Sequence, residues 1–269
     1  MPITASLVFA AGRGSRMEGY EGNKTLLPLI PENGPYQGAH PILIEILQSL
    51  PPGPKGVVVH YRKADVMAAT SGLGVSYCEQ PELNGTGGAL LAARPFLEKA
   101  NVDHFLIAMG DVPFVKRETY ETLLRTLIPH HLTVLGFRPE SKGRYGLLET
   151  DGKEVKRIIE WEYWHRMAKD RQNTLSICNS GIYALRKEVL DQILEVLAST
   201  PHRVRKTIDG RVCHVEEYFI TDVIEPLHQS GRSVGFLVAD SPEEVMGIDT
   251  PQALKKAQRI FQESHVSSA

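Results

Sequence analysis

The chain has 269 residues, of which 42% are hydrophobic and 23% charged, the ordinary composition of a globular protein with a substantial core. Its 30 basic and 32 acidic residues give a net charge of -2, which excludes a general attraction to nucleic acid or to an anionic membrane surface. Any recognition of phosphate must therefore come from a local group of cations.

In the first half of the chain, short apolar runs rich in β-branched residues alternate with helical patterns. Strands are predicted at 6–10, 56–60, 75–78, 104–109 and 132–138, and helices at 41–49, 63–69, 87–99 and 116–127. This alternation predicts an α/β fold with a doubly wound, mixed but mainly parallel sheet. In such sheets ligands bind beyond the carboxyl ends of the strands, so the loops after the first and fourth strands should share one site.

The second half predicts a strand pair, 145–150 and 155–160, around the turn at Asp151 and Gly152. Further strands are predicted at 175–185 and 233–239, and helices at 160–169, 187–197, 221–229 and 251–262. Thr250 or Asp249 would cap the last helix. We expect a single domain over 1–264 and a frayed tail over 265–269.

Targeting signals and metal-binding cysteines are not evident in the sequence. No run is long enough to span a membrane, and the N-terminal segment has no basic region or long apolar core of a signal peptide. Cys78, Cys178 and Cys213 are odd in number and far apart, which is typical of reduced thiols. The adjacent His130 and His131 indicate a solvated turn rather than a metal site. We expect a cytoplasmic protein whose oligomeric state the sequence leaves open.

The most informative segment follows the first predicted strand. It reads Gly12-Arg13-Gly14-Ser15-Arg16-Met17, and Lys24 follows it. Backbone N–H groups of a glycine-rich loop can approach phosphate oxygens, and arginine and lysine neutralise the charge. The segment is neither a P-loop, since no Gly-Lys-Ser/Thr follows, nor a dinucleotide fingerprint, since Met17 replaces the third glycine. It predicts a polyphosphate site, with an ordinary glycine turn as the alternative.

Two downstream segments could serve a nucleotide. The Gln80 amide can pair with the edge of a base, and Gly85-Thr86 would let the backbone approach it closely. Asp111, after Gly110 at a strand end, could hold a divalent metal that bridges phosphates. A helix cap at Thr86 and a simple turn at Asp111 are the structural alternatives.

Three later segments could serve a second substrate. Gly146 with Glu160, and Asn179 in Asn-Ser-Gly, offer polar partners for a sugar. Asp249 could be a second metal carboxylate, with a role as helix cap as the alternative.

In this order, over Leu7 to about Leu254, these segments resemble the sugar-nucleotide pyrophosphorylase family of nucleotidyltransferases. The resemblance is greatest to the N-acetylglucosamine-1-phosphate uridylyltransferase domain, and the stretch Glu217–Asp222 adds to it. It implies a Rossmann-like, GT-A-like nucleotidyltransferase fold. It also implies a Mg²⁺-dependent reaction of UTP with a sugar 1-phosphate, N-acetylglucosamine 1-phosphate being the first choice, to give a UDP-sugar and pyrophosphate.

The resemblance also implies a role for each matching residue. Arg16, Lys24 and Asp111 would be catalytic, and Asp111 and Asp249 would hold Mg²⁺. The nucleotide-binding half, about 1–140, would bind through Ala10, Ala11, Gly12, Gly14, Gln80, Gly85, Thr86 and Gly110. In the sugar-phosphate half, about 141–250, the contacts would be Gly146, Glu160 and Asn179.

The chain departs from the family's pattern at several positions. Asn23 stands where a proline usually precedes the lysine, Leu147 where an arginine usually follows Tyr-Gly, and Asp249 where an asparagine is usual. Because Leu147 stands in place of that arginine, the sequence leaves the identity of the sugar open. Trp161 and Trp164 could pack in the core, which we favour because buried aromatic rings contribute much apolar area, or stack on a sugar.

Two kinds of alternative stay open. The enzyme could use another sugar 1-phosphate or another nucleotide, as a glucose-1-phosphate thymidylyl- or uridylyltransferase, a guanylyltransferase or a cytidylyltransferase. The chain could instead be a non-catalytic domain that binds a sugar nucleotide and regulates a partner. Bifunctional relatives carry an acetyltransferase domain of hexapeptide repeats after the closing helix, and no such repeat follows here, so acetyl transfer is not expected.

Overall fold

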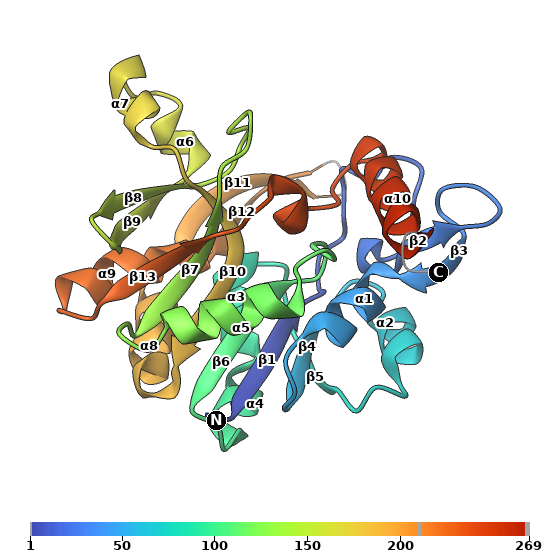
Figure 1. Ribbon diagram of the computed structural model, residues 1–269, viewed down its shortest axis with the longest axis horizontal. Coiled ribbons are helices and arrows are strands. Elements are labelled where there is room, and N and C mark those ends of the chain that lie inside the picture. The colour runs from blue at the N-terminus through green and yellow to red at the C-terminus, as the bar shows by residue number, and fades with distance from the viewer. Residues whose placement is uncertain (1, 209–210, 267–269) are drawn as a thin grey trace.

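A nine-stranded mixed sheet forms the centre of the computed structural model, which describes residues 2–208 and 211–266 (Figure 1). The strand order is β5-β4-β1-β6-β10-β7-β13-β9-β8. The strands are β1 (Thr4–Phe9), β4 (Lys55–Val59), β5 (Ser76–Glu79), β6 (His104–Met109), β7 (Leu132–Phe137), β8 (Leu147–Asp151), β9 (Glu154–Ile159), β10 (Cys178–Arg186) and β13 (Val234–Val238). All except β9 and β10 run in one direction, which confirms the predicted mixed, mainly parallel α/β sheet.

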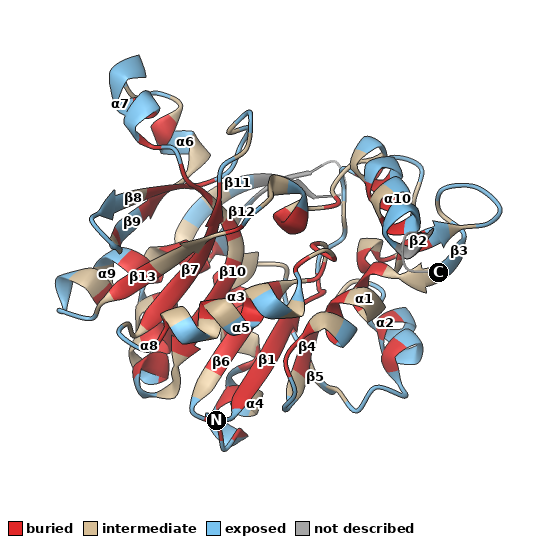
Figure 2. Ribbon diagram, viewed as in Figure 1, coloured by how far each residue is buried: buried red, intermediate tan, exposed pale blue. Residues whose placement is uncertain are grey.

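Helices cover both faces of this sheet, and each face has its own apolar core. One face packs against α1 (Ile42–Ser49), α2 (Lys63–Thr70), α5 (Arg117–Thr126) and α10 (Pro251–Val266). The other packs against α3 (Gly85–Ala92), α4 (Arg94–Lys99), α8 (Leu190–Ser199) and α9 (Ile224–Gln229). Side chains of β1 alternate between the two cores, Val8 on one side and Leu7 and Phe9 on the other, so β1 is buried along its whole length (Figure 2).

One edge of the sheet gathers the segments that the sequence singled out. The glycine loop, Gln80 and Asp111 follow the carboxyl ends of β1, β5 and β6. Since β10 runs antiparallel to β6, Asn179 near its start lies at this same edge. Leu147 at the start of β8 pairs with both the start of β10 and the end of β9, which brings the second half of the chain to the edge as well.

Two helix predictions were wrong in their extent. The helix expected at 87–99 is two helices, α3 and α4, because Pro95 at the start of α4 has no N–H to continue the α3 ladder. The helix expected at 160–169 is only the short α6 (Trp161–Trp164), and α7 (Lys169–Thr174) follows separately. Between them the Gln172 side chain donates to the His165 and Met167 carbonyl oxygens, which replaces helical hydrogen bonds.

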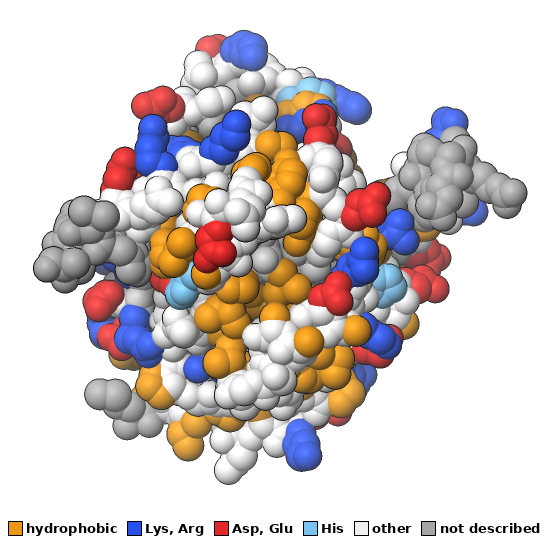
Figure 3. Space-filling model, turned by 90° about the vertical axis from the view of Figure 1, so that its right-hand side faces the viewer, with side chains coloured by type: hydrophobic (Ala, Val, Ile, Leu, Met, Phe, Trp, Pro, Cys, Tyr) orange, Lys and Arg blue, Asp and Glu red, His pale blue; other side chains and the backbone are white. Residues whose placement is uncertain are grey.

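Two hairpins were not predicted. The strands β2 (Pro28–Pro31) and β3 (Gly38–Pro41) lie beneath α10, and Figure 3 faces this side of the molecule, where hydrophobic side chains gather centrally between charged ones. The strands β11 (His202–Ile208) and β12 (Arg211–Glu217) form the second hairpin. Helix α10 continues to Val266, so it includes the first two residues of the predicted tail, and 267–269 lie outside the described residues.

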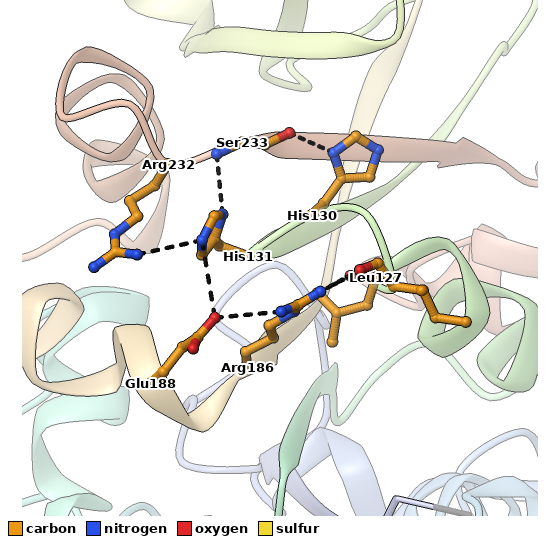
Figure 4. A network of polar contacts seen from close by, with 8 residues as sticks. Leu127, His130, His131, Arg186, Glu188, Arg232 and Ser233 are labelled. Atoms are coloured by element: carbon orange, nitrogen blue, oxygen red, sulfur yellow. Dashed lines mark hydrogen bonds and ion pairs between the residues drawn. The ribbon is translucent and has the colours of Figure 1, made fainter.

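The adjacent histidines join strands rather than forming a merely solvated turn (Figure 4). His130 Nδ1 lies 2.5 Å from the Ser233 hydroxyl, and His131 Nδ1 accepts from the Ser233 N–H at 3.1 Å. The other nitrogen of His131 lies 3.8 Å from Glu188. This network fastens the start of β7 to β13, at the edge of the sheet opposite to the candidate site. In the described part of the chain, no helix is long and apolar enough to cross a membrane.

Candidate active site

A lysine shared by two aspartates lies where the loops after β1 and β6 meet the segment before α10. Lys24 Nζ donates to Asp111 Oδ2 and, at 2.5 Å, to Asp249 Oδ1. Arg16 Nη2 pairs with the other oxygen of Asp249 at 2.9 Å. The Ile248 N–H donates to the Asp111 carbonyl oxygen at 2.9 Å, so the backbone also joins the two aspartate segments. The structure thus brings together the four charged residues that the sequence singled out.

Burial and charge act in opposite directions on this cluster. Burial alone would lower the pKa of Lys24, whose side chain is 13% exposed, but the charges of Asp111 and Asp249 outweigh it and the pKa is raised. Burial alone would raise the pKa of Asp249, but Lys24 and then Arg16 outweigh it and the pKa is lowered. Lys24 and Asp249 are therefore both charged at neutral pH.

Asn23 fixes the position of the lysine. It is 1% exposed and precedes the short 3₁₀ helix η1 (Lys24–Leu26). Its Nδ2 donates to the carbonyl oxygens of Ala10 at 3.0 Å and Tyr61 at 2.8 Å, and its Oδ1 accepts from the N–H and hydroxyl of Thr25. Asn23 thus ties η1 to the ends of β1 and β4. This role was not predicted from the departure from proline, although the preference of asparagine for helix N-caps could have indicated it.

The second glycine of the loop packs against the lysine stem. Gly14 has φ +64°, and a Cβ at this position would lie 2.9 Å from Lys24 Cβ. Both the left-handed backbone and the close approach require glycine here. Gly14 therefore helps to hold Lys24 between the aspartates, in addition to its predicted contact with phosphate.

A cleft of about 990 Å³ opens beside this cluster. Of the predicted nucleotide residues it is lined by Ala11, Gly12, Gly14, Gln80, Gly85 and Thr86, together with Lys24 and Asp111. Arg13 lies over the Tyr61 ring, 5.6 Å from its centroid, and also lines the cleft. The size and the glycine-rich wall of the cleft are compatible with a nucleotide, and Arg13 and Lys24 are the cations that line it.

The far wall of the cleft is a turn organised by Gln80. The Gln80 side chain is 2% exposed, and its Nε2 donates to Asn84 Oδ1 at 2.8 Å and to the Gly85 carbonyl oxygen at 3.2 Å. No described residue donates to its Oε1, which leaves that oxygen as an acceptor for a ligand. Gly85, at φ +92°, packs against the Tyr218 carbonyl oxygen, and Thr86 Oγ1 accepts from the Ile220 N–H. Thr86 is not the helix cap, since Asn84 precedes α3.

Two predicted nucleotide residues do not line the cleft. The Ala10 side chain is buried, its N–H donates to the Val58 carbonyl oxygen, and its own carbonyl oxygen accepts from Asn23. Gly110 donates its N–H to the Phe9 carbonyl oxygen at 3.0 Å. Both residues support the backbone on which the cleft residues stand.

The predicted sugar residues form a second group. The Asn179 N–H donates to the Gly146 carbonyl oxygen at 2.8 Å, and the Glu160 carboxylate lies beside Gly146, where it accepts from the Thr221 hydroxyl at 2.7 Å. Burial raises the pKa of Glu160, although the Thr221 hydrogen bond opposes this shift. A carboxyl group of this kind can exchange hydrogen bonds with sugar hydroxyls.

The Asn179 amide is engaged within the protein. Its Oδ1 accepts from the Gly181 N–H at 3.0 Å, and its Nδ2 donates to the Tyr183 hydroxyl at 2.8 Å. These contacts stabilise the irregular stretch at the start of β10. The side chain therefore shapes the site, and its predicted contact with a sugar would require it to share these hydrogen bonds.

The two tryptophans after Glu160 differ in role. Trp164 is buried and donates its Nε1–H to the Tyr145 carbonyl oxygen at 2.8 Å, which confirms packing for this residue. Trp161 is partly exposed and stacks on the His165 ring at 4.2 Å. Leu147, in place of the family's arginine, is fully buried, so it presents no polar group to a substrate.

The carboxylate pair has the chemistry of a magnesium site. Thr250 Oγ1 accepts from the Ala253 N–H at 3.2 Å and so caps α10, which leaves Asp249 free to join the cluster. Among the described residues, no group of three or more metal-binding side chains occurs. Mg²⁺ is commonly held by only one or two carboxylates with substrate phosphates, so Asp111 and Asp249 fit it.

Comparison with known proteins identifies the family. The MobA-like NTP transferase domain matches residues 6–206, and the chain belongs to this family. The bifunctional protein GlmU of Cereibacter sphaeroides (strain ATCC 17023) is 32% identical over 95% of this chain and 52% of its own length. GlmU of Alcanivorax borkumensis is 27% identical over 98% and 53%. The chain thus spans about half the length of the curated relatives it matches.

Solved structures show the same fold. The uridine diphosphate N-acetylglucosamine pyrophosphorylase of Trypanosoma brucei superposes with a TM-score of 0.71 at 12% identity, over 94% of this chain and 64% of that one. A CMP:2-keto-3-deoxy-manno-octonic acid synthetase superposes with a TM-score of 0.64 at 15% identity, over 97% and 99%. These structures confirm the predicted Rossmann-like nucleotidyltransferase fold.

Substitution Asn23→Ala should destabilise the protein, because the carbonyl oxygens of Ala10 and Tyr61 would lose their donor. We expect the free energy of unfolding in urea to fall by about 2 kcal/mol. Asn101→Ala, at an exposed asparagine, is the matched control and should change it little. Equal stability of the two variants would contradict this account.

Substitution Lys24→Met should make stability depend on pH in a new way. In the wild type, the depressed pKa of Asp249 contributes stability that is present at neutral pH and is lost as the pH falls through the folded-state pKa. Without Lys24 the two carboxylates repel each other, and Asp249 loses the positive charge that contributes most to lowering its pKa. The variant should therefore be less stable than the wild type by about 3 kcal/mol at pH 7, and the difference should shrink towards pH 4.

Urea unfolding of both proteins at a series of pH values measures this difference, and Lys255→Met, at an exposed lysine of α10, is the control. A difference that is constant from pH 4 to pH 8 would show that the lysine does not hold Asp249 in its charged form.

Proposed function

We propose that this member of the MobA-like NTP transferase family is a Mg²⁺-dependent nucleotidyltransferase that makes a UDP-sugar and pyrophosphate from UTP and a sugar 1-phosphate. N-acetylglucosamine 1-phosphate is the favoured acceptor. The observation that carries the proposal is the Lys24–Asp111–Asp249 cluster, which lies beside a glycine-walled cleft and at the same edge of the sheet as Asn179 of the predicted sugar group. The similarity to GlmU supports the choice of sugar.

In the proposed reaction, an oxygen of the sugar 1-phosphate attacks the α-phosphorus of UTP in line. The bond from the α-phosphorus to the bridging oxygen breaks, and pyrophosphate leaves with that electron pair. The attacking phosphate is already anionic, so no enzyme nucleophile and no general base are needed. The contribution of the protein is then the positioning of two substrates and the neutralisation of their charge.

The residues of the cluster divide these tasks. Lys24, held by Asn23 and Gly14, would move its ammonium group from the carboxylates to the phosphates as they bind, and Arg16 would face the departing pyrophosphate. Asp111 and Asp249 would hold Mg²⁺, which when bound supplies positive charge and orients phosphate oxygens. Release of Lys24 from the carboxylates would thus accompany loading of the site.

Recognition of the base would fall to Gln80. Its Nε2 is used within the protein, and its Oε1 can accept a hydrogen bond from N3–H of uracil. Thymine carries the same N3–H, so a thymidylyltransferase is the second candidate.

Pyrophosphate release across a grid of nucleoside triphosphates and sugar 1-phosphates, with and without Mg²⁺, tests the proposal. We expect release with UTP and N-acetylglucosamine 1-phosphate, and none after chelation of the metal. Release with no pair would favour a non-catalytic binding domain. Release with another pair would keep the reaction class and correct the substrates.

Substitution Asp111→Asn should lower turnover by about two orders of magnitude or more, because half of the predicted carboxylate pair is lost. The fold should survive, since Asn preserves the shape of the side chain. Asp191→Asn, at an exposed aspartate of α8, is the matched control. Turnover of the Asp111 variant at the wild-type rate would exclude this residue from the reaction.

A further inference from the structure

An arginine held on an aromatic ring stands beside the predicted sugar residues. The Arg144 guanidinium lies 4.2 Å from the centroid of the Trp161 ring, and the other side of the indole stacks on His165 at 4.2 Å and 12°. Arg144 is exposed, and its side chain makes no ion pair and no hydrogen bond with the residues that the structure describes. All five of its N–H donors are therefore available to a ligand.

The position of this arginine relative to the site follows from the chain itself. Arg144 precedes Gly146 by two residues, and Trp161 directly follows Glu160. Gly146 and Glu160 are in contact, so the stacked pair flanks the group predicted to bind the acceptor. Trp161 and Glu160 lie at the end of β9, and Arg144 lies just before β8.

The loop that carries Arg144 is fastened to the segment that carries Trp161. Trp164 donates to the Tyr145 carbonyl oxygen at 2.8 Å, and Lys142 Nζ donates to the Gln172 carbonyl oxygen at 2.6 Å. Figure 1 shows α6 and α7 as a projecting lobe beyond β8 and β9. These contacts, together with the stack, restrict the arginine before any ligand binds, which reduces the entropy lost on binding.

A planar guanidinium with free donors is suited to bidentate recognition of phosphate or carboxylate. From this geometry we propose that Arg144, stacked on Trp161, is a specificity-determining residue that binds an oxyanion of the acceptor substrate. The inference rests on the proposed function, because it presumes that the acceptor occupies the group of Gly146, Glu160 and Asn179. The oxyanion is either the 1-phosphate or a carboxylate on the sugar ring. Arg144 would then supply the positive charge that is missing at position 147, where the family's arginine is replaced by the buried Leu147.

The test compares Arg144→Met with Arg166→Met, a matched control at an exposed arginine of the same lobe. KM for the sugar 1-phosphate should rise about 10- to 100-fold in the Arg144 variant, the cost of a lost charge-assisted hydrogen bond. KM for the nucleotide and the thermal midpoint should stay at the wild-type values. Arg144→Lys keeps the charge, and Trp161→Leu removes the stack. Both variants should have KM values for the sugar 1-phosphate between those of the wild type and Arg144→Met.

Two substrates distinguish whether Arg144 binds the 1-phosphate or a carboxylate on the sugar ring. If Arg144 binds the 1-phosphate, Arg144→Met should raise KM by the same factor for N-acetylglucosamine 1-phosphate and glucuronic acid 1-phosphate. If Arg144 binds a ring carboxylate, the wild type should prefer glucuronic acid 1-phosphate, and Arg144→Met should lose only that preference. Either result supports the proposal, and kinetics equal to those of Arg166→Met with both substrates would overturn it.

Calorimetric binding of the same two sugar phosphates distinguishes this proposal from the proposed function. A wild type that binds a sugar phosphate but releases no pyrophosphate would refute the reaction, and weaker binding by Arg144→Met would still support the role of the arginine. A wild type that binds neither compound would overturn the role of the arginine.

Discussion

The site depends on one lysine that is shared by two aspartates. Lys24 lies 87 residues from Asp111 and 225 from Asp249 in sequence, and it holds the two carboxylates together. Two like charges this close would otherwise repel each other, so the lysine is what makes their convergence tolerable. Much of the local structure serves this contact: Asn23 fixes the lysine backbone, Gly14 makes room for its stem, and the Ile248 N–H aligns the two aspartate segments.

The sheet explains why these segments can meet. Parallel strands deliver the glycine loop, the Gln80 turn and Asp111 to one edge, and the reversed strand β10 returns Asn179 to the same place. The result is two groups of polar side chains at one edge of the sheet, one around a glycine-walled cleft that includes Lys24 and Asp111, and one around Glu160. That arrangement suits a reaction in which two anionic substrates must be brought together.

Local sequence patterns predicted most of the fold, because alternating β and α periodicity directly reflects burial on the two faces of the sheet. The sequence also singled out Lys24, Asp111 and Asp249, since they stand in motifs of a recognisable family, and the structure brings these three residues together. What the sequence could not predict depends on contacts between distant segments. The hydrogen bonds from Asn23 to the Ala10 and Tyr61 carbonyl oxygens and the stack of Arg144 on Trp161 each join residues from different segments. The hairpin of β2 and β3, rich in proline and glycine, lacks the alternation that would have indicated strands.

The capped start of α10 has a consequence for the order in which the protein matures during synthesis. Thr250 anchors Asp249 to a helix that packs against β2, so the second carboxylate reaches the lysine only when this helix docks. A nascent chain that has left the ribosome up to residue 240 contains the glycine loop, Lys24 and Asp111, but it does not yet contain Asp249. The nascent chain therefore carries the lysine with one aspartate until the segment that contains Asp249 has been made.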